Sequence, residues 1–80
     1  MEIDDALAEL SGKEKSTRCA RLLHICERYF GKPRIQGSHH IFKMPWPGDP
    51  RINIQADKTK AKAYQVRDVI RCLTKLKDWG

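Results

Sequence analysis

The chain has 80 residues, with 16 Lys and Arg against 10 Asp and Glu, a formal net charge of +6 and a pI near 9.5. A chain of this size forms one domain that buries only about 60% of the surface exposed by its unfolded form. This length excludes a substrate domain beside a separate cofactor domain. Any active site therefore lies on the surface of one small unit, where a protein partner can cover it.

The charges are unevenly distributed along the chain. Six of the ten acids precede Gly31, whereas residues 31–80 contain four acids and eleven Lys and Arg. A basic surface of this kind favours polyanions, with nucleic acid as the first candidate. The alternative is an ordinary lysine-rich surface, because net charge bears on association and not on fold.

The three cysteines, Cys19, Cys26 and Cys72, are odd in number and lack the paired spacing of a metal site. They are typical of reduced, buried hydrophobic residues in a cytoplasmic protein. No apolar run approaches the roughly 18 residues of a membrane span, and the acidic start MEIDDALAEL is unlike a signal peptide. We therefore expect a cytoplasmic location and no membrane partner.

Two helices are predicted in the first half of the chain. Residues 2–10 favour a short helix that Ser11-Gly12 ends, and a polar segment runs to residue 16. The next helix begins near Thr17, with Ser16 or Thr17 as its cap, and ends at Gly31. Its apolar residues follow helical spacing: Cys19, Leu22, Leu23, Cys26, Tyr29 and Phe30.

Three short strands are predicted next, over 34–36, 39–44 and 51–55, with a turn at Gly37-Ser38. If Phe42 and Met44 face the core, alternation sends His40 inward beside them. His39, Ile41 and Lys43 then point outward. In the proline-rich loop 45–50, Trp46 is expected to be exposed and to stack on a base or dock a partner, or else to pin the loop onto the core.

A lysine-rich loop at 57–62 precedes a last helix with Val66, Val69, Ile70, Leu73 and Leu76 on one face. We expect Trp79 to pack under this helix. The predicted fold class is α+β, a two-layer sandwich in which two helices cover one face of a three-stranded antiparallel sheet, in the order α-β-β-β-α. An extra N-terminal helix would lie in an extension, residues 1–16, that precedes the domain formed by residues 17–80.

His39 is the residue on which a catalytic function depends. An imidazole titrates near neutrality, and RNA cleavage by the 2′-hydroxyl requires one proton to be removed and another to be supplied. Lys43, Arg51 or a loop lysine could offset the charge that develops on the phosphorus. A surface histidine without a role is the alternative. No metal site is predicted, because adjacent strand residues such as His39 and His40 point to opposite faces.

The segment Gly37-Ser38-His39-His40-Ile41-Phe42-Lys43, with the following hairpin and the strand 51–55, resembles the core of HicA-type toxins. The run from Lys62 to Ile70 resembles their closing helix, so the similarity covers about residues 18–74. The resemblance implies a fold like the double-stranded-RNA-binding domain and a toxin that cleaves mRNA without metal or other cofactor, thereby inhibiting translation. It also implies that His39 is catalytic and that a HicB-type antitoxin neutralises the protein.

The residues expected to contact RNA surround His39 or lie in the basic segments that follow it: Gly37, Ser38, His40, Lys43, Arg51, Lys58 and Lys60. The antitoxin is expected to cover His39 and this basic face. Two other functions fit the same residues. One is a non-catalytic RNA-binding module of the same fold, which would grip RNA by shape and phosphate contacts. The other is an interaction protein whose basic face binds an acidic partner.

Overall fold

The computed structural model describes residues 2–48, 50–56 and 59–79. Its elements are α1 (Ile3–Leu10), α2 (Cys19–Phe30), β1 (Arg34–Gln36), β2 (His39–Lys43), β3 (Arg51–Gln55) and α3 (Ala63–Asp78). The predicted α+β architecture with the order α-β-β-β-α and an additional N-terminal helix is confirmed. None of the described helices is long and apolar enough to cross a membrane.

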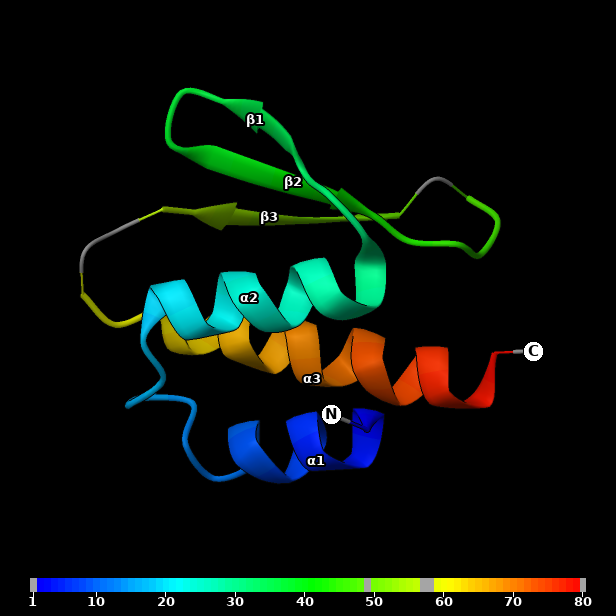
Figure 1. Ribbon diagram of the computed structural model, residues 1–80, viewed down its shortest axis with the longest axis horizontal. Coiled ribbons are helices and arrows are strands. Elements are labelled where there is room, and N and C mark those ends of the chain that lie inside the picture. The colour runs from blue at the N-terminus through cyan, green and yellow to red at the C-terminus, as the bar shows by residue number, and fades with distance from the viewer. Residues whose placement is uncertain (1, 49, 57–58, 80) are drawn as a thin grey trace.

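The three strands form an antiparallel sheet in the order β1-β2-β3. His39 at the start of β2 lies opposite Gln36 on one side and Gln55 on the other. Helices α2 and α3 lie side by side against one face of this sheet (Figure 1), contacting β2 and β3 respectively. The opposite face of the sheet is covered by no element of the described chain (Figure 1).

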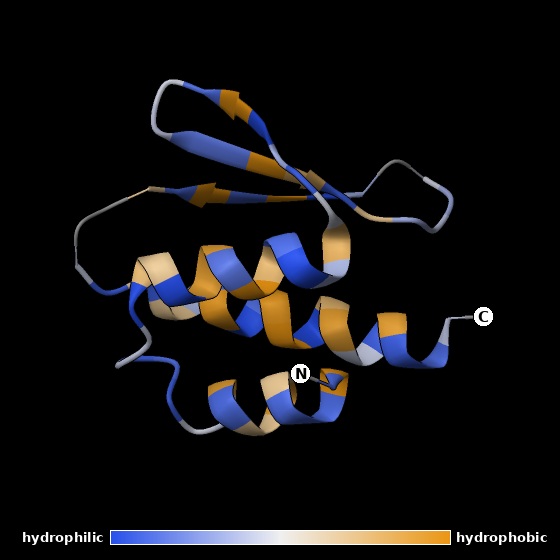
Figure 2. Cartoon of the chain, viewed as in Figure 1, coloured by the Kyte–Doolittle hydropathy of each residue, from blue (hydrophilic) through white to orange (hydrophobic). Residues whose placement is uncertain are grey.

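Alternation along the strands decides which face is buried. In β3, Ile52 and Ile54 are buried while Arg51, Asn53 and Gln55 are exposed, as period two requires of a strand with one face on a core. Figure 2 shows the same alternation along the strand and apolar stripes along the helices. The largest fully buried side chains are Phe42, Leu10, Leu22, Ile25, Ile54, Leu73, Val66 and Val69. Each contributes about 1.5–3 kcal/mol relative to an exposed position.

Helix α1 packs against α3, on the far side of the helical layer from the sheet (Figure 1). Ala6 and Leu10 are fully buried there. Among the described residues, two ion pairs also link α1 to the other helices: Arg21 Nε lies 2.6 Å from Glu9 Oε2, and Lys77 Nζ lies 2.6 Å from Asp4 Oδ1. The segment expected to precede the domain therefore contributes to the same hydrophobic core.

Helix α2 begins differently from the sequence prediction. Neither Ser16 nor Thr17 caps it; Arg18 occupies the N-cap position and makes no side-chain capping bond. The Thr17 hydroxyl instead donates to the Lys13 carbonyl at 2.8 Å, and the Cys19 N–H donates to the Thr59 carbonyl at 3.0 Å. A chain segment distant in sequence thus supplies the acceptor that a capping side chain would have given.

The prediction that Trp46 is exposed is wrong, because its indole is only 7% exposed. The ring packs edge-on against Trp79, with centroids 6.0 Å apart, and Lys75 Nζ lies 4.8 Å from its centroid. The alternative, an indole that pins the loop to the core, is what the structure shows. Trp79, which was expected to pack under α3, is 45% exposed and contacts the Trp46 ring.

Candidate nucleic-acid interface and catalytic site

The uncovered face of the sheet carries His39 together with the other strand residues that point outward. The strand register places the following residues on it: Arg34, Gln36, His39, Ile41, Lys43, Arg51, Asn53 and Gln55. Three of these side chains are cationic and one is an imidazole. None of the strand residues on this face is an acid, so the face attracts anions such as phosphates.

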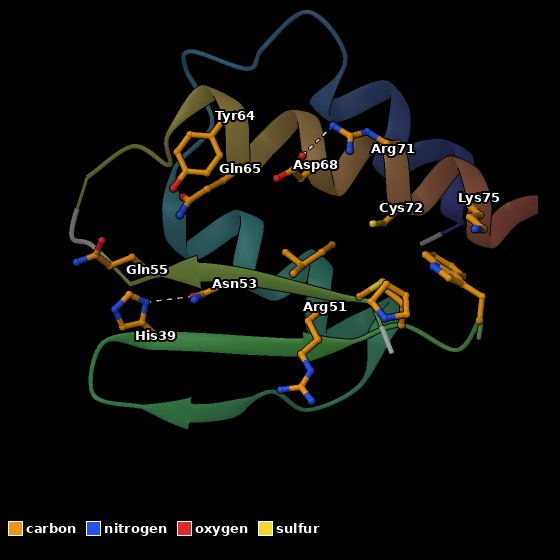
Figure 3. A pocket seen from close by; sticks show the side chains of 14 residues that line it. His39, Arg51, Asn53, Gln55, Tyr64, Gln65, Asp68, Arg71, Cys72 and Lys75 are labelled. Carbon is orange, nitrogen blue, oxygen red and sulfur yellow. Dashed lines mark hydrogen bonds and ion pairs between the residues drawn. The ribbon is translucent and has the colours of Figure 1, made fainter. Parts of the chain in front are cut away.

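His39 is positioned by the turn between β1 and β2. Gly37 adopts a φ of +59°, a conformation that glycine accommodates without steric cost, and the Ala56 N–H donates to the Ser38 carbonyl at 2.6 Å. The His39 ring is exposed, and its Nδ1 lies 3.1 Å from Asn53 Oδ1 (Figure 3). When the amide oxygen accepts this bond, Nδ1 carries the proton and Nε2 keeps a lone pair available for proton transfer.

The other candidate RNA contacts form two groups, one near each end of β2. Gly37 and Ser38 flank His39 directly, and Lys60 lies in a small depression that Gln55, the cross-strand neighbour of His39, also lines. Lys43 and Arg51 face each other at the opposite end of β2 and β3. Lys43 is four positions further along β2 than His39, a distance of about 13 Å along a strand. Lys58 lies outside the described residues.

His40 is separated from the other candidate RNA contacts. Its side chain is half-buried on the helix-covered side of the sheet, opposite Ile54, as the alternation predicted. Its Nδ1 is buried and has no hydrogen-bond partner in the part of the chain that the structure describes. The structure therefore brings His39 to the open face and His40 to the core.

A pocket of about 570 Å³ opens between β3 and α3. His39 and Tyr64 lie at one end of it, and Lys75 lies at the other, beside the Trp46 indole (Figure 3). Arg71 lines the middle and is ion-paired with Asp68 at 2.9 Å. The sequence prediction did not include this pocket, because it depends on how far α3 lies from the edge of the sheet.

The sequence did not predict a role for two residues near His39, the polar Asn53 and the aromatic Tyr64. Asn53 was recognisable only as an outward position of β3, and its contact with His39 follows from the register of β2 and β3. Tyr64 stands at the second position of α3 and is 53% exposed. Its signal in the sequence was an aromatic side chain outside the apolar stripe of its helix.

The cysteines show no features of a catalytic nucleophile. Cys19 and Cys26 are buried, Cys72 is half-buried and all three are free thiols. Burial raises the pKa of the Cys26 thiol to about 12, so its reactive thiolate form is scarce at neutral pH. Among residues 2–48, 50–56 and 59–79, no three His, Cys, Asp or Glu side chains form a group that could hold a metal ion.

Comparisons of the chain with models of protein families, with curated proteins and with solved structures found no match.

Proposed function

We propose that this protein is a metal-independent endoribonuclease that cleaves mRNA, acting as the toxin of a type II toxin–antitoxin pair, as its resemblance to HicA-type toxins implies. The observation that carries the proposal is the placement of His39. Its ring is exposed on a face whose strands bring cations and no acids, and its Nδ1 lies 3.1 Å from Asn53 Oδ1. With Nδ1–H donating to that amide oxygen, Nε2 serves as the base.

In the proposed reaction, His39 Nε2 takes the proton from a ribose 2′-hydroxyl. The 2′-oxygen then forms a bond to the adjacent phosphorus while the bond from phosphorus to the 5′-oxygen breaks. A proton from water neutralises the leaving 5′-oxygen, so the products carry a 2′,3′-cyclic phosphate and a 5′-hydroxyl. Cationic side chains near the site, Lys60 above all, offset the negative charge on the phosphorane.

The proposed partner is a HicB-type antitoxin in the cytoplasm. A catalytic group on an open face of a small domain is inhibited most simply by covering it. The basic face favours an acidic surface on this antitoxin, which would also speed association of the two proteins.

The test is purified His39→Ala protein incubated with mRNA, with Gln36→Ala as the matched control. Gln36 lies opposite His39 on the same face and is also exposed. We expect His39→Ala to melt at nearly the wild-type temperature, since exposed substitutions change stability by about 0.5 kcal/mol or less. Its cleavage rate should fall about 100- to 10,000-fold, while Gln36→Ala cleaves normally.

Cleavage by the wild type should also persist in EDTA. Wild-type rates in His39→Ala, or loss of cleavage on chelation of metal, would contradict the proposal.

One observation favours a second candidate, an RNA-binding module that does not cleave. On the strand residues of the open face, His39 is accompanied by no other imidazole and no carboxyl group that could donate the second proton. In that case wild type and His39→Ala would bind RNA equally and neither would cleave it.

A further inference from the structure

The pocket between β3 and α3 has the features of a binding site for a nucleobase. Its volume of about 570 Å³ lies in the range of small-ligand sites. It begins at His39, so it is continuous with the proposed cleavage site. RNA that reaches His39 on the open face can therefore place a neighbouring base in this pocket without crossing the molecule.

Tyr64 provides an aromatic surface at the His39 end of the pocket. Tyr64 is 53% exposed although it lies only two residues before Val66, the first of the fully buried apolar residues of α3. The neighbouring Gln65 is buried, and its Oε1 accepts a hydrogen bond from the Lys62 N–H at 3.3 Å, which fixes the first turn of α3. Single-stranded RNA is recognised largely by bases that stack on aromatic side chains in this way.

The edge of β3 offers hydrogen-bonding groups to the same space. Met44 donates to the Pro50 carbonyl and Ala56 donates to the Ser38 carbonyl, so the even-numbered residues of β3 bond to β2 and the odd-numbered ones point away from it. The Gln55 carbonyl confirms this direction, since it accepts from Cys19 Sγ at 3.4 Å. Within the described chain, the main-chain N–H and C=O of Asn53 bond to no protein group.

The charges along the pocket favour a nucleic acid over a neutral ligand. Arg51, Arg71 and Lys75 line it, against one acid, Asp68, among the described lining residues. Asp68 is ion-paired with Arg71, so the pocket keeps a positive net charge that suits the phosphates on either side of a bound base.

From these observations we infer that the β3–α3 pocket binds one unstacked base of single-stranded RNA, with Tyr64 as the stacking platform and the β3 edge contacting the rim of the base. The inference deepens the proposed function, because it makes Tyr64 a specificity-determining residue for the RNA that His39 would cleave. Tyr64 itself takes no part in proton transfer.

The test measures binding separately from cleavage, in a His39→Ala background. The probe is a fluorescein-labelled single-stranded RNA of about 12 nucleotides, followed by fluorescence anisotropy. Adding Tyr64→Ala should raise Kd about 5- to 150-fold, the effect of losing one stacked base, while Tyr64→Phe keeps the aromatic face and changes Kd little. Thr74→Ala is the matched control, because Thr74 is exposed on the same helix, outside the pocket, and bonds only to the Ile70 carbonyl.

A second arm replaces single nucleotides of the RNA by abasic residues. At one position the abasic RNA should lose the same affinity as Tyr64→Ala does, and combining both changes should cost no more than either alone. The inference would be overturned by an unchanged Kd for Tyr64→Ala, or by losses of affinity from Tyr64→Ala and from the abasic nucleotide that are additive at every position. The occupant of the pocket would then be a polypeptide strand. Failure of the proposed function gives a different result. In that case the wild-type protein binds this RNA in a Tyr64-dependent manner but does not cleave it.

Discussion

His39 and His40 are adjacent in sequence and have opposite environments. The alternation of β2 exposes the first ring beside Asn53 and buries Nδ1 of the second on the helix-covered side. A single step along the strand thus separates an exposed ring, the proposed catalytic group, from one that is half-buried on the helix-covered side. The two residues therefore provide an internal comparison of chemistry and stability.

We predict that His40→Ala lowers stability without abolishing cleavage. The change removes a half-buried ring from the core side of the sheet, and substitutions at such positions cost about 1–3 kcal/mol. Urea unfolding followed by circular dichroism measures the loss, and RNA cleavage below the unfolding transition measures the activity. A variant as stable as wild type that no longer cleaves would assign the catalytic role to His40 instead.

At the scale of elements, α1 depends on side-chain contacts outside its own eight residues. Leu10 and Ala6 are buried against the helical layer, and Glu9 reaches Arg21 on α2 through two contacts of 2.6 and 2.7 Å. An isolated helix of this length is marginal in water. Its docking is therefore sensitive to changes in these contacts.

We predict that the Glu9–Arg21 pair makes the docking of α1 pH-dependent. The hydrogen bonds from Arg21 lower the pKa of the Glu9 carboxyl in the folded protein. A carboxyl whose pKa is lowered on folding stabilises the fold above its unfolded pKa, and this contribution is lost as the pH falls through the folded value. Glu9→Gln should therefore be less stable than wild type at pH 7.

The stability difference between Glu9→Gln and wild type should shrink as the pH falls below the unfolded pKa of about 4.3. Thermal melts of both proteins at several pH values test this expectation. Both side chains of the pair are partly exposed, so the difference at pH 7 should be small. A difference that stays constant down to acidic pH would show that the carboxylate charge is not the cause.

The elements with strong local patterns could be predicted from sequence, and those that depend on distant partners could not. The alternation of Ile52 and Ile54 identified β3, and the apolar stripe identified α2 with its end at Gly31. The predicted capping of α2 was wrong because the acceptor for the Cys19 N–H is the Thr59 carbonyl, which belongs to the loop before α3. The prediction that Trp46 is exposed was wrong for the same reason, since its ring contacts lie in the last turn of α3 and the C-terminal segment.

At the scale of the whole molecule, the sheet separates two surfaces. The helix-covered side contains the hydrophobic core, and the open side contains His39 with its cationic neighbours. The sequence predicted this division because period two sorts strand residues by face. It did not predict the pocket beside β3, which requires the position of α3 relative to the sheet edge.

The asymmetry of the molecule leads to a prediction about salt. If the open face binds RNA through phosphates, the logarithm of affinity should fall linearly with the logarithm of salt concentration, by about 0.7 for each phosphate neutralised on a single strand. Lys43→Glu, Arg51→Glu and Lys60→Glu should each weaken binding. Each should also reduce the slope by about the contribution of one phosphate.

The control for net charge is Lys15→Glu, which makes the same change in charge at an exposed position in the turn between α1 and α2. This turn lies on the helical side of the molecule (Figure 1). A localised RNA site predicts that Lys15→Glu keeps the wild-type slope, because few phosphates reach that side. Equal losses in all four variants would mean that overall charge, and not the face around His39, attracts the RNA, whereas an affinity independent of salt would favour a protein partner.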